Sequence, residues 1–207
     1  MTGPSNVIDD IATLEKLYGA PSEASTVKEV DHVHPIYRKL IQAAPFAVLA
    51  TSGPGGLDAS PRGDGPGFVT VEDEKTLLLP DRRGNNRTDS LRNIVGDPRV
   101  ALVFLIPGIG ETLRVNGRAS ISVEAALLRR FAVESKEPRS VLVIAVDTVY
   151  FQCSRAVARA DLWNPTKHAR RSALPSTGAI LAALSNAKLG GESYDRALLE
   201  RVKATLY

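Results

Sequence analysis

Cysteine and histidine are scarce in this sequence, which has one cysteine and three histidines among 207 residues. A disulfide within the chain is excluded, because Cys153 has no second cysteine to pair with. The histidines and Cys153 do not fall into the spacing of a zinc site either. We therefore expect no metal site.

Long apolar runs are also absent. None approaches the roughly 20 residues that span a bilayer, and the first ten residues lack the basic and then apolar pattern of a secretion signal. With 43% hydrophobic and 24% charged residues, the composition is typical of a globular protein. We expect a cytoplasmic protein with no membrane partner.

No large excess of one charge is present, since the net charge is +3, but the charges are unevenly distributed. Residues 1–31 carry six acids and two bases, whereas residues 114–171 carry eleven bases and five acids. The bases are interleaved with apolar runs, and aromatic residues make up only 5% of the chain. This pattern argues against nucleic acid as a partner, although the basic region can face an anion.

The apolar pattern predicts an α+β fold. Helices are expected over 8–17, 31–44, 86–95, 123–132, 178–184 and 194–202. Strand-like runs cover 46–51, 57–61, 67–71, 76–80, 100–106, 112–119 and 141–151. The runs between 46 and 80 read as a meander, and few long crossovers follow. We expect about six strands in a closed antiparallel barrel, because closure removes exposed strand edges.

Two arginine-bearing polar loops, Ser60–Asp64 and Asp81–Arg87, each follow an apolar strand-like run. The second loop runs into the helix expected from residue 86, whose first amides lack partners and carry partial positive charge. Guanidinium forks and these amides together favour one phosphate. The alternative is a solvated turn that only caps the helix, since glycine, asparagine and arginine are common in surface turns.

The order of these elements resembles that of the pyridoxamine 5′-phosphate oxidase-like FMN-binding split barrels. The series runs from a helix through Leu49–Thr51, the Ser60–Asp64 loop, Pro80–Asp81, Asn85–Arg87 and Asp97–Pro98 to a hairpin containing Arg114–Ala119. Cys153–Ser154 and Leu162–Pro165 are similar to those of an uncharacterised subgroup of FMN-dependent flavoproteins. The resemblance implies a six-stranded antiparallel split-barrel domain over 31–165, with helical extensions over 1–30 and 166–207.

The same resemblance implies a homodimer with two FMN molecules in clefts between the subunits, and an FMN-dependent oxidoreductase activity on a small molecule. The implied cofactor contacts are Arg62, Gly63 and Asp64 along the cofactor, Pro80 and Asp81 near its ring, Asn86 and Arg87 on its phosphate, Thr112 facing the flavin, and Trp163 from the partner subunit. No catalytic residue is assigned, because the flavin ring itself carries out the electron or hydride transfer.

Alternatives stay open at several points. The chain is also consistent with a non-catalytic flavin- or haem-binding sensing module, or with a deazaflavin-dependent reductase. Trp163 is as consistent with anchoring the tail on the barrel, and Cys153 is expected to be a small buried hydrophobe. Asn164 and Pro165 follow Trp163 where oxidases of pyridoxamine phosphate carry an Arg-x-His element, so vitamin B6 oxidation is not the expected reaction.

The tail helices contain an apolar stripe with no phosphate-binding signal. We expect these helices to form a lid or a dimer brace and to contribute little to cofactor binding.

Overall fold

A computed structural model describes residues 6–207, and its centre is one antiparallel sheet of seven strands. The strands are β1 (Phe46–Gly53), β2 (Gly56–Gly63), β3 (Thr70–Val71), β4 (Thr76–Asp81), β5 (Arg99–Leu105), β6 (Thr112–Ser122) and β7 (Ser140–Gln152). The α+β class is confirmed. The expected strand count of six is corrected to seven, since the short β3 pairs with β4 as an edge strand.

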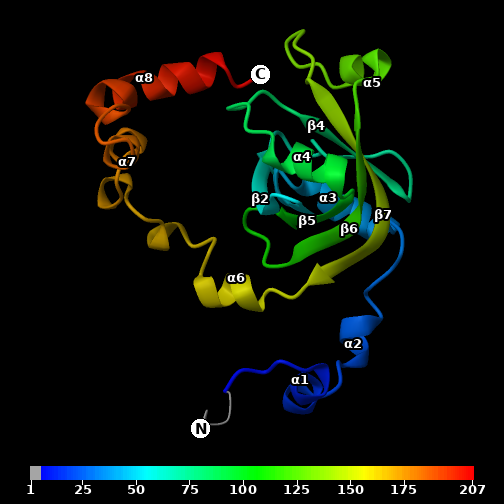
Figure 1. Cartoon of the computed structure of the whole chain (residues 1–207). Helices are drawn as coiled ribbons and strands as arrows, with labels where there is room; N and C mark the ends of the chain where they lie inside the picture. The colour runs from blue at the N-terminus through cyan, green and yellow to red at the C-terminus, as the bar shows by residue number, and fades with distance from the viewer. Residues whose placement is uncertain (1–5) are drawn as a thin grey trace.

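The predicted meander and the closed barrel were both wrong. The sheet order is β2-β1-β5-β6-β7-β4-β3, so β2 and β3 follow each other in the sequence but lie at opposite edges. This happens because β4 pairs with the distant β7 rather than with β2. The sheet curves strongly into an incomplete, open barrel (Figure 1), which is called the barrel below. Arg62 Nη2 of the edge strand β2 lies 4.0 Å from Asp81 Oδ1 at the end of β4.

The core lies inside this curved sheet. Ala47 and Leu49 of β1 alternate with more exposed residues, as expected for a strand with one buried face. In β4 the residues Leu77–Leu79 are all buried, because Leu78 packs into a second cluster with Phe131 on the opposite face. Burial of these aliphatic side chains is the main stabilising contribution to the sheet.

Two helices close the open parts of the sheet. The helix α3 (Pro35–Ala43) begins with a proline in its first turn and buries Tyr37 and Ile41. The helix α4 (Asp89–Gly96) packs against β1, where Asn93 Nδ2 donates to Thr51 Oγ1 over 3.2 Å. This helix starts three residues later than predicted, because Asn86 has a φ of 62°, in the left-handed region outside the helical range.

A bulge in β6 fixes the curvature where this strand pairs with β7. The register shifts between Asn116 and Gly117. A Cβ at Gly117 would lie 2.3 Å from the carbonyl oxygen of Ala145, so the backbones approach too closely for any side chain at this position.

Short helices extend from the barrel on both sides. They are α1 (Ile11–Tyr18), α2 (Glu23–Thr26), α5 (Ala125–Arg130), α6 (Arg155–Ala160), the 3₁₀ helices η1 (Pro165–Lys167) and η2 (Arg171–Ala173), α7 (Thr177–Leu184) and α8 (Gly191–Ala204). In Figure 1 the segment from α6 to α8 forms an arm that leaves the barrel at one end and returns to it at the other.

Boundaries at residues 30/31 and 165/166 stay a prediction, and residues 1–5 of the first extension lie outside the described residues. Within residues 6–207, none of the helices has the length and hydrophobicity needed to traverse a bilayer.

Candidate functional site

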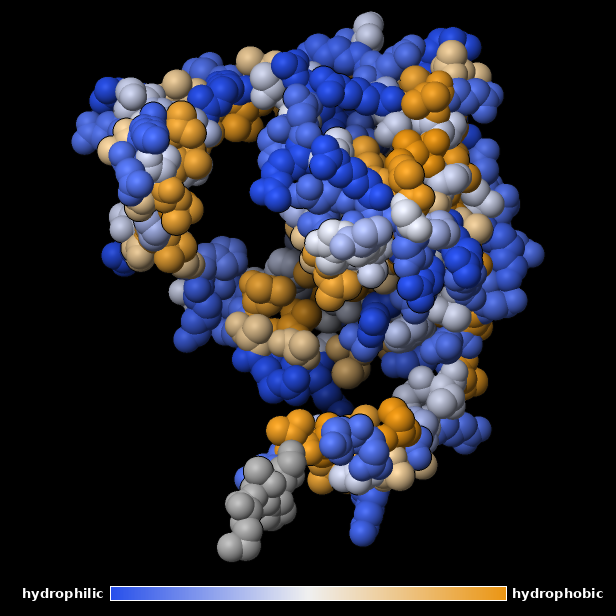
Figure 2. All heavy atoms as spheres, viewed as in Figure 1, coloured by the Kyte–Doolittle hydropathy of each residue, from blue (hydrophilic) through white to orange (hydrophobic). Residues whose placement is uncertain are grey.

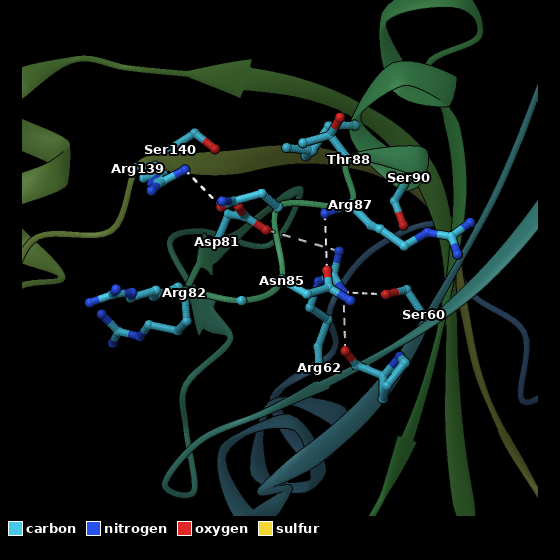
Figure 3. A pocket seen from close by; sticks show the side chains of 15 residues that line it. Ser60, Arg62, Asp81, Arg82, Asn85, Arg87, Thr88, Ser90, Arg139 and Ser140 are labelled. Carbon is cyan, nitrogen blue, oxygen red and sulfur yellow. Dashed lines mark hydrogen bonds and ion pairs between the residues drawn. The ribbon is translucent and has the colours of Figure 1, made fainter. Parts of the chain in front are cut away.

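The two polar loops predicted from the sequence line one pocket of about 480 Å³ (Figure 3). Its lining contains five arginines and a single acid, namely Arg62, Arg82, Arg83, Arg87, Arg139 and Asp81. Gly63 and Pro80 line an adjoining pocket of about 200 Å³. The excess of guanidinium groups favours an anionic ligand.

Arg62 is one of the two more buried arginines of the pocket, since its side chain and that of Arg82 are each 19% exposed. Its Nη1 donates to Ser60 Oγ and, over 3.0 Å, to the Pro61 carbonyl oxygen. Its Nε is buried and has no hydrogen-bond partner among the described residues. A buried donor without an acceptor is unfavourable, so an oxyanion in the pocket would satisfy a group that the protein leaves unpaired.

Asp81 is the acid of the pocket. Burial raises the pKa of its carboxyl group above the ordinary value, while Arg62 and Arg139 act in the opposite direction. Its ionised form would repel a bound anion, but the five surrounding guanidinium groups outnumber it. Asp81 therefore moderates the positive potential of the pocket and makes it dependent on pH.

Asp64 has all its contacts within the protein. Its Oδ1 accepts from the Gly65 amide and from the Tyr207 hydroxyl, both at 2.7 Å, and its Oδ2 accepts from Arg82 Nε at 2.9 Å. Burial alone would raise the pKa of Asp64, but these three hydrogen bonds together hold it below the ordinary value. The structure thus places Asp64 behind the pocket, as the group that orients Arg82.

Arg87 is more exposed than its predicted role requires. Its side chain is 77% exposed and pairs with Asp89, with Nη2 lying 2.8 Å from Oδ2. In Figure 3 the guanidinium group extends away from Arg62. It also lines a neighbouring pocket of about 510 Å³ that includes Arg92. Arg87 therefore has to leave Asp89 before it can bind an anion beside Arg62.

Asn86 and the start of α4 form the rim of the pocket. Asn86 Oδ1 accepts from Arg139 Nη1 over 3.0 Å, which ties the loop after β4 to the segment before β7. Thr88, the N-cap residue, makes no side-chain capping bond, and both Thr88 and Ser90 line the pocket. The polar rim is thus assembled around the beginning of a helix, where amides favour negative charge.

Thr112 and Trp163 do not line this pocket. Thr112 begins β6 and pairs with Gln152 at the end of β7. Trp163 Nε1 donates over 2.7 Å to the carbonyl oxygen of Ile109, in the connection between β5 and β6. This hydrogen bond ties the tail to the β5–β6 connection, and a contact of Trp163 with a cofactor stays a prediction.

The sequence reasoning missed Arg139 and Ser140 as members of the site. Both line the pocket because β7 pairs with β4 so that Ser140 lies opposite Asp81. Arg139 did precede a long apolar run, as the residues of the two predicted loops border such runs. Without knowledge of strand pairing, this signal does not indicate that the start of β7 lies beside the end of β4.

One further expectation needs correction. Cys153 is exposed rather than buried, because β7 ends at Gln152 and the chain turns into α6. The small contribution of the tail to cofactor binding stays a prediction, although Tyr207 at the end of the tail bonds to Asp64. Among residues 6–207, histidine, cysteine and acidic side chains form no group of three or more suited to hold a metal ion.

The model of the family described as Pyridoxamine 5'-phosphate oxidase matches residues 33–153, which include both polar loops and all seven strands up to the end of the sheet. The chain belongs to this family. The match ends just before α6, so the tail that carries Trp163 and Tyr207 lies outside the matched residues.

Solved structures resemble a little more than half of the chain. HupZ from Group A Streptococcus has 20% identity and a TM-score of 0.47, with 56% of this chain and 91% of that chain covered. A FAD-binding protein from Mesorhizobium loti has 17% identity and a TM-score of 0.42, with 58% and 94% covered. The FAD binding protein from Mycobacterium smegmatis has 11% identity and a TM-score of 0.39, with 58% and 95% covered. No curated protein matches the chain.

Proposed function

We propose that this protein is an FMN-dependent oxidoreductase that acts on a small molecule, with the FMN phosphate in the arginine-lined pocket between β2 and α4. The observation that carries the proposal is the unpaired, buried Nε of Arg62 in a pocket with five guanidinium groups. Membership of the pyridoxamine 5'-phosphate oxidase family supports a flavin as the source of the anion.

The residues of the pocket fit a phosphate monoester. Arg62 contributes a guanidinium group whose buried Nε has no partner among the described residues, Ser60 accepts from Arg62 Nη1 and keeps its own hydroxyl proton, and Arg139 lines the same pocket. A dianion needs several fixed donors, and charge-assisted bonds from guanidinium groups are among the strongest available. Bound FMN would supply electron or hydride transfer at its ring. The protein's own part is to bind and orient the phosphate end and to keep the ring edge against polar backbone near Pro80.

A homodimer is part of the proposal. Thr112 and Trp163 lie at the β5–β6 connection and do not share a pocket with Arg62. A second copy of the chain therefore has to supply the other wall if these residues are to contact the same flavin. Apolar side chains that are left exposed in the single chain, including Leu57, Val95, Ile180 and Leu199, provide surface for such an association.

Three ligands of one series test the proposal. Purified protein is titrated with FMN, riboflavin and FAD while flavin fluorescence is followed, and the mass and absorbance spectrum of any copurified molecule are recorded. FMN should bind more tightly than riboflavin, because only FMN offers the terminal phosphate. Equal affinity for FMN and riboflavin contradicts the assignment of the pocket.

Reduction distinguishes an enzyme from a binding module. An oxidoreductase should show reduction of bound FMN by NADH or NADPH, followed as loss of the flavin absorbance band, with reoxidation by an acceptor over repeated cycles. FMN that stays oxidised with both donors supports a storage or sensing role. A copurified deazaflavin in place of FMN identifies the third possibility.

A further inference from the structure

The tail of the chain touches the candidate site at one residue, Tyr207. In Figure 1 the arm formed by α6, α7 and α8 runs beside the barrel and reaches it again where the chain ends next to β4 and α5. In Figure 2 the background is visible between this arm and the barrel, so the two are not packed together along their length. The contact of Tyr207 with Asp64 and Arg82 joins the far end of the arm to the barrel.

Tyr207 makes two interactions with the ion pair behind the pocket. Its hydroxyl donates to Asp64 Oδ1 over 2.7 Å, and its ring lies under the guanidinium group of Arg82, with 5.5 Å between Cζ and the ring centroid. A phenol that hydrogen-bonds a carboxylate and stacks on an arginine restrains both partners.

Arg82 is held from three sides. Its Nε donates to Asp64 Oδ2 over 2.9 Å, its Nη1 donates to the Phe131 carbonyl oxygen over 2.5 Å, and the Tyr207 ring covers one face. The same arginine lines both the main pocket and a smaller one of about 220 Å³ that Tyr207 itself borders. A change at Tyr207 therefore reaches the anion pocket through Arg82.

We propose that Tyr207 is a positioning residue for the candidate cofactor site. Its hydroxyl fixes Asp64, Asp64 fixes Arg82, and Arg82 completes the wall of arginines that faces the anion. The contact also closes the arm, so occupation of the pocket and attachment of α8 stabilise each other. This inference rests on the proposed FMN function for the identity of the ligand. The contact between Tyr207 and Asp64 is independent of which ligand binds.

Three variants separate the parts of this contact. Tyr207→Phe removes the hydroxyl and keeps the ring over Arg82, while Tyr207→Ala removes both. Tyr194→Phe is the matched control, because Tyr194 stacks on Arg201 at 4.2 Å within α8 and does not line the anion pocket. All three are compared as full-length proteins.

The first readout needs no flavin. Hydrogen–deuterium exchange of residues 81–84 and 191–206 should speed up in Tyr207→Ala and, less strongly, in Tyr207→Phe, and should stay at the wild-type rate in Tyr194→Phe. Wild-type exchange in all variants overturns the proposal, whatever the protein binds.

The second readout is the affinity for FMN and its pH dependence. Tyr207→Phe should lower the affinity for FMN about three- to tenfold. This is the effect expected when one hydrogen bond that positions Arg82 indirectly is lost. The acidic limit of FMN binding should also move to higher pH, since Asp64 keeps Arg82 and the Gly65 amide but loses the phenol. The charged groups that act on Tyr207 are Asp64, Arg82 and Glu134, and Arg83, Lys136, Glu137 and Arg139 line the small pocket that Tyr207 borders.

The two readouts distinguish the possible failures. A wild-type protein that ignores FMN but shows faster exchange in the Tyr207 variants disproves the proposed cofactor and keeps the arm contact. FMN binding that is tight and identical in wild type and Tyr207→Phe at every pH disproves the positioning role and keeps the cofactor.

Discussion

Replacing Arg62 is the most direct test of the anion pocket. Arg62→Ala removes the buried Nε that lacks a partner and the guanidinium group that faces Asp81. A hydrogen bond to a charged group contributes about 1.5 to 3 kcal/mol. At about 1.36 kcal/mol for each factor of ten, the affinity for FMN should fall by roughly 10- to 150-fold.

Comparison with riboflavin isolates the phosphate. Riboflavin lacks that group, so Arg62→Ala should change its affinity much less than it changes the affinity for FMN. Both affinities are measured by quenching of flavin fluorescence, and circular dichroism checks that the variant is folded. Equal losses for the two ligands, or no loss for FMN, would refute the assignment of Arg62 to the phosphate.

Arg87 offers a contrast within the same pocket. It is 77% exposed and paired with Asp89, so Arg87→Ala should weaken FMN by less than about fivefold. Arg99→Ala is the matched control, because Arg99 is 71% exposed, pairs with Asp97 in a similar way and lies outside the pocket. A larger effect for Arg87→Ala than for Arg62→Ala would mean that Arg87 leaves Asp89 and carries the main phosphate contact.

Three further predictions concern pH, packing and assembly. Burial raises the folded-state pKa of Asp81, so the folded protein binds this proton more tightly than the unfolded chain does. The free energy of unfolding should therefore fall as pH rises from about 4 through that raised pKa. Asp81→Asn should lack this part of the fall in urea titrations and should bind FMN more tightly at neutral pH. Gly117→Ala should destabilise the fold by about 1 to 3 kcal/mol, since its Cβ would lie 2.3 Å from the Ala145 carbonyl oxygen, whereas Gly55→Ala, with no atom within 4 Å, should be nearly neutral. Light scattering at micromolar concentration should give twice the 22.2 kDa chain mass, and an FMN-bound monomer would contradict the shared site.

Local signals in the sequence were sufficient for the type of most elements. The apolar runs at 46–51, 76–80 and 141–151 became β1, β4 and β7, because alternation or continuity of apolar residues follows from how much of a strand is buried. The sequence also indicated that the two loops belong to one site, since arginine, asparagine and glycine at strand ends supply donors and a flexible backbone, and residues of both loops do line one pocket.

Sequence alone did not determine how these pieces meet. Pairing of β4 with β7, rather than β2 with β3, depends on contacts between residues about sixty to seventy positions apart, and no local pattern encodes such a partner. Because of that pairing, β2 and β3 lie at opposite edges of the sheet and the expected closed barrel does not form. The same pairing places Arg139 at the pocket. Arg62 of β2 lies beside Asp81 of β4, although these two strands are not paired with each other.

The roles of single residues were decided by the same long-range packing. Arg62 and Arg87 look equivalent in the sequence. In the structure Arg62 has a buried Nε without a partner, whereas Arg87 is exposed and forms an ion pair with Asp89. Tyr207 gave no signal at all, because its importance arises only from the path of the arm, which brings it to Asp64 across 143 positions of the chain. The sequence by itself determined which chemical groups are available, while the tertiary structure decided which of them share a pocket, because proximity depends on the packing of the whole chain.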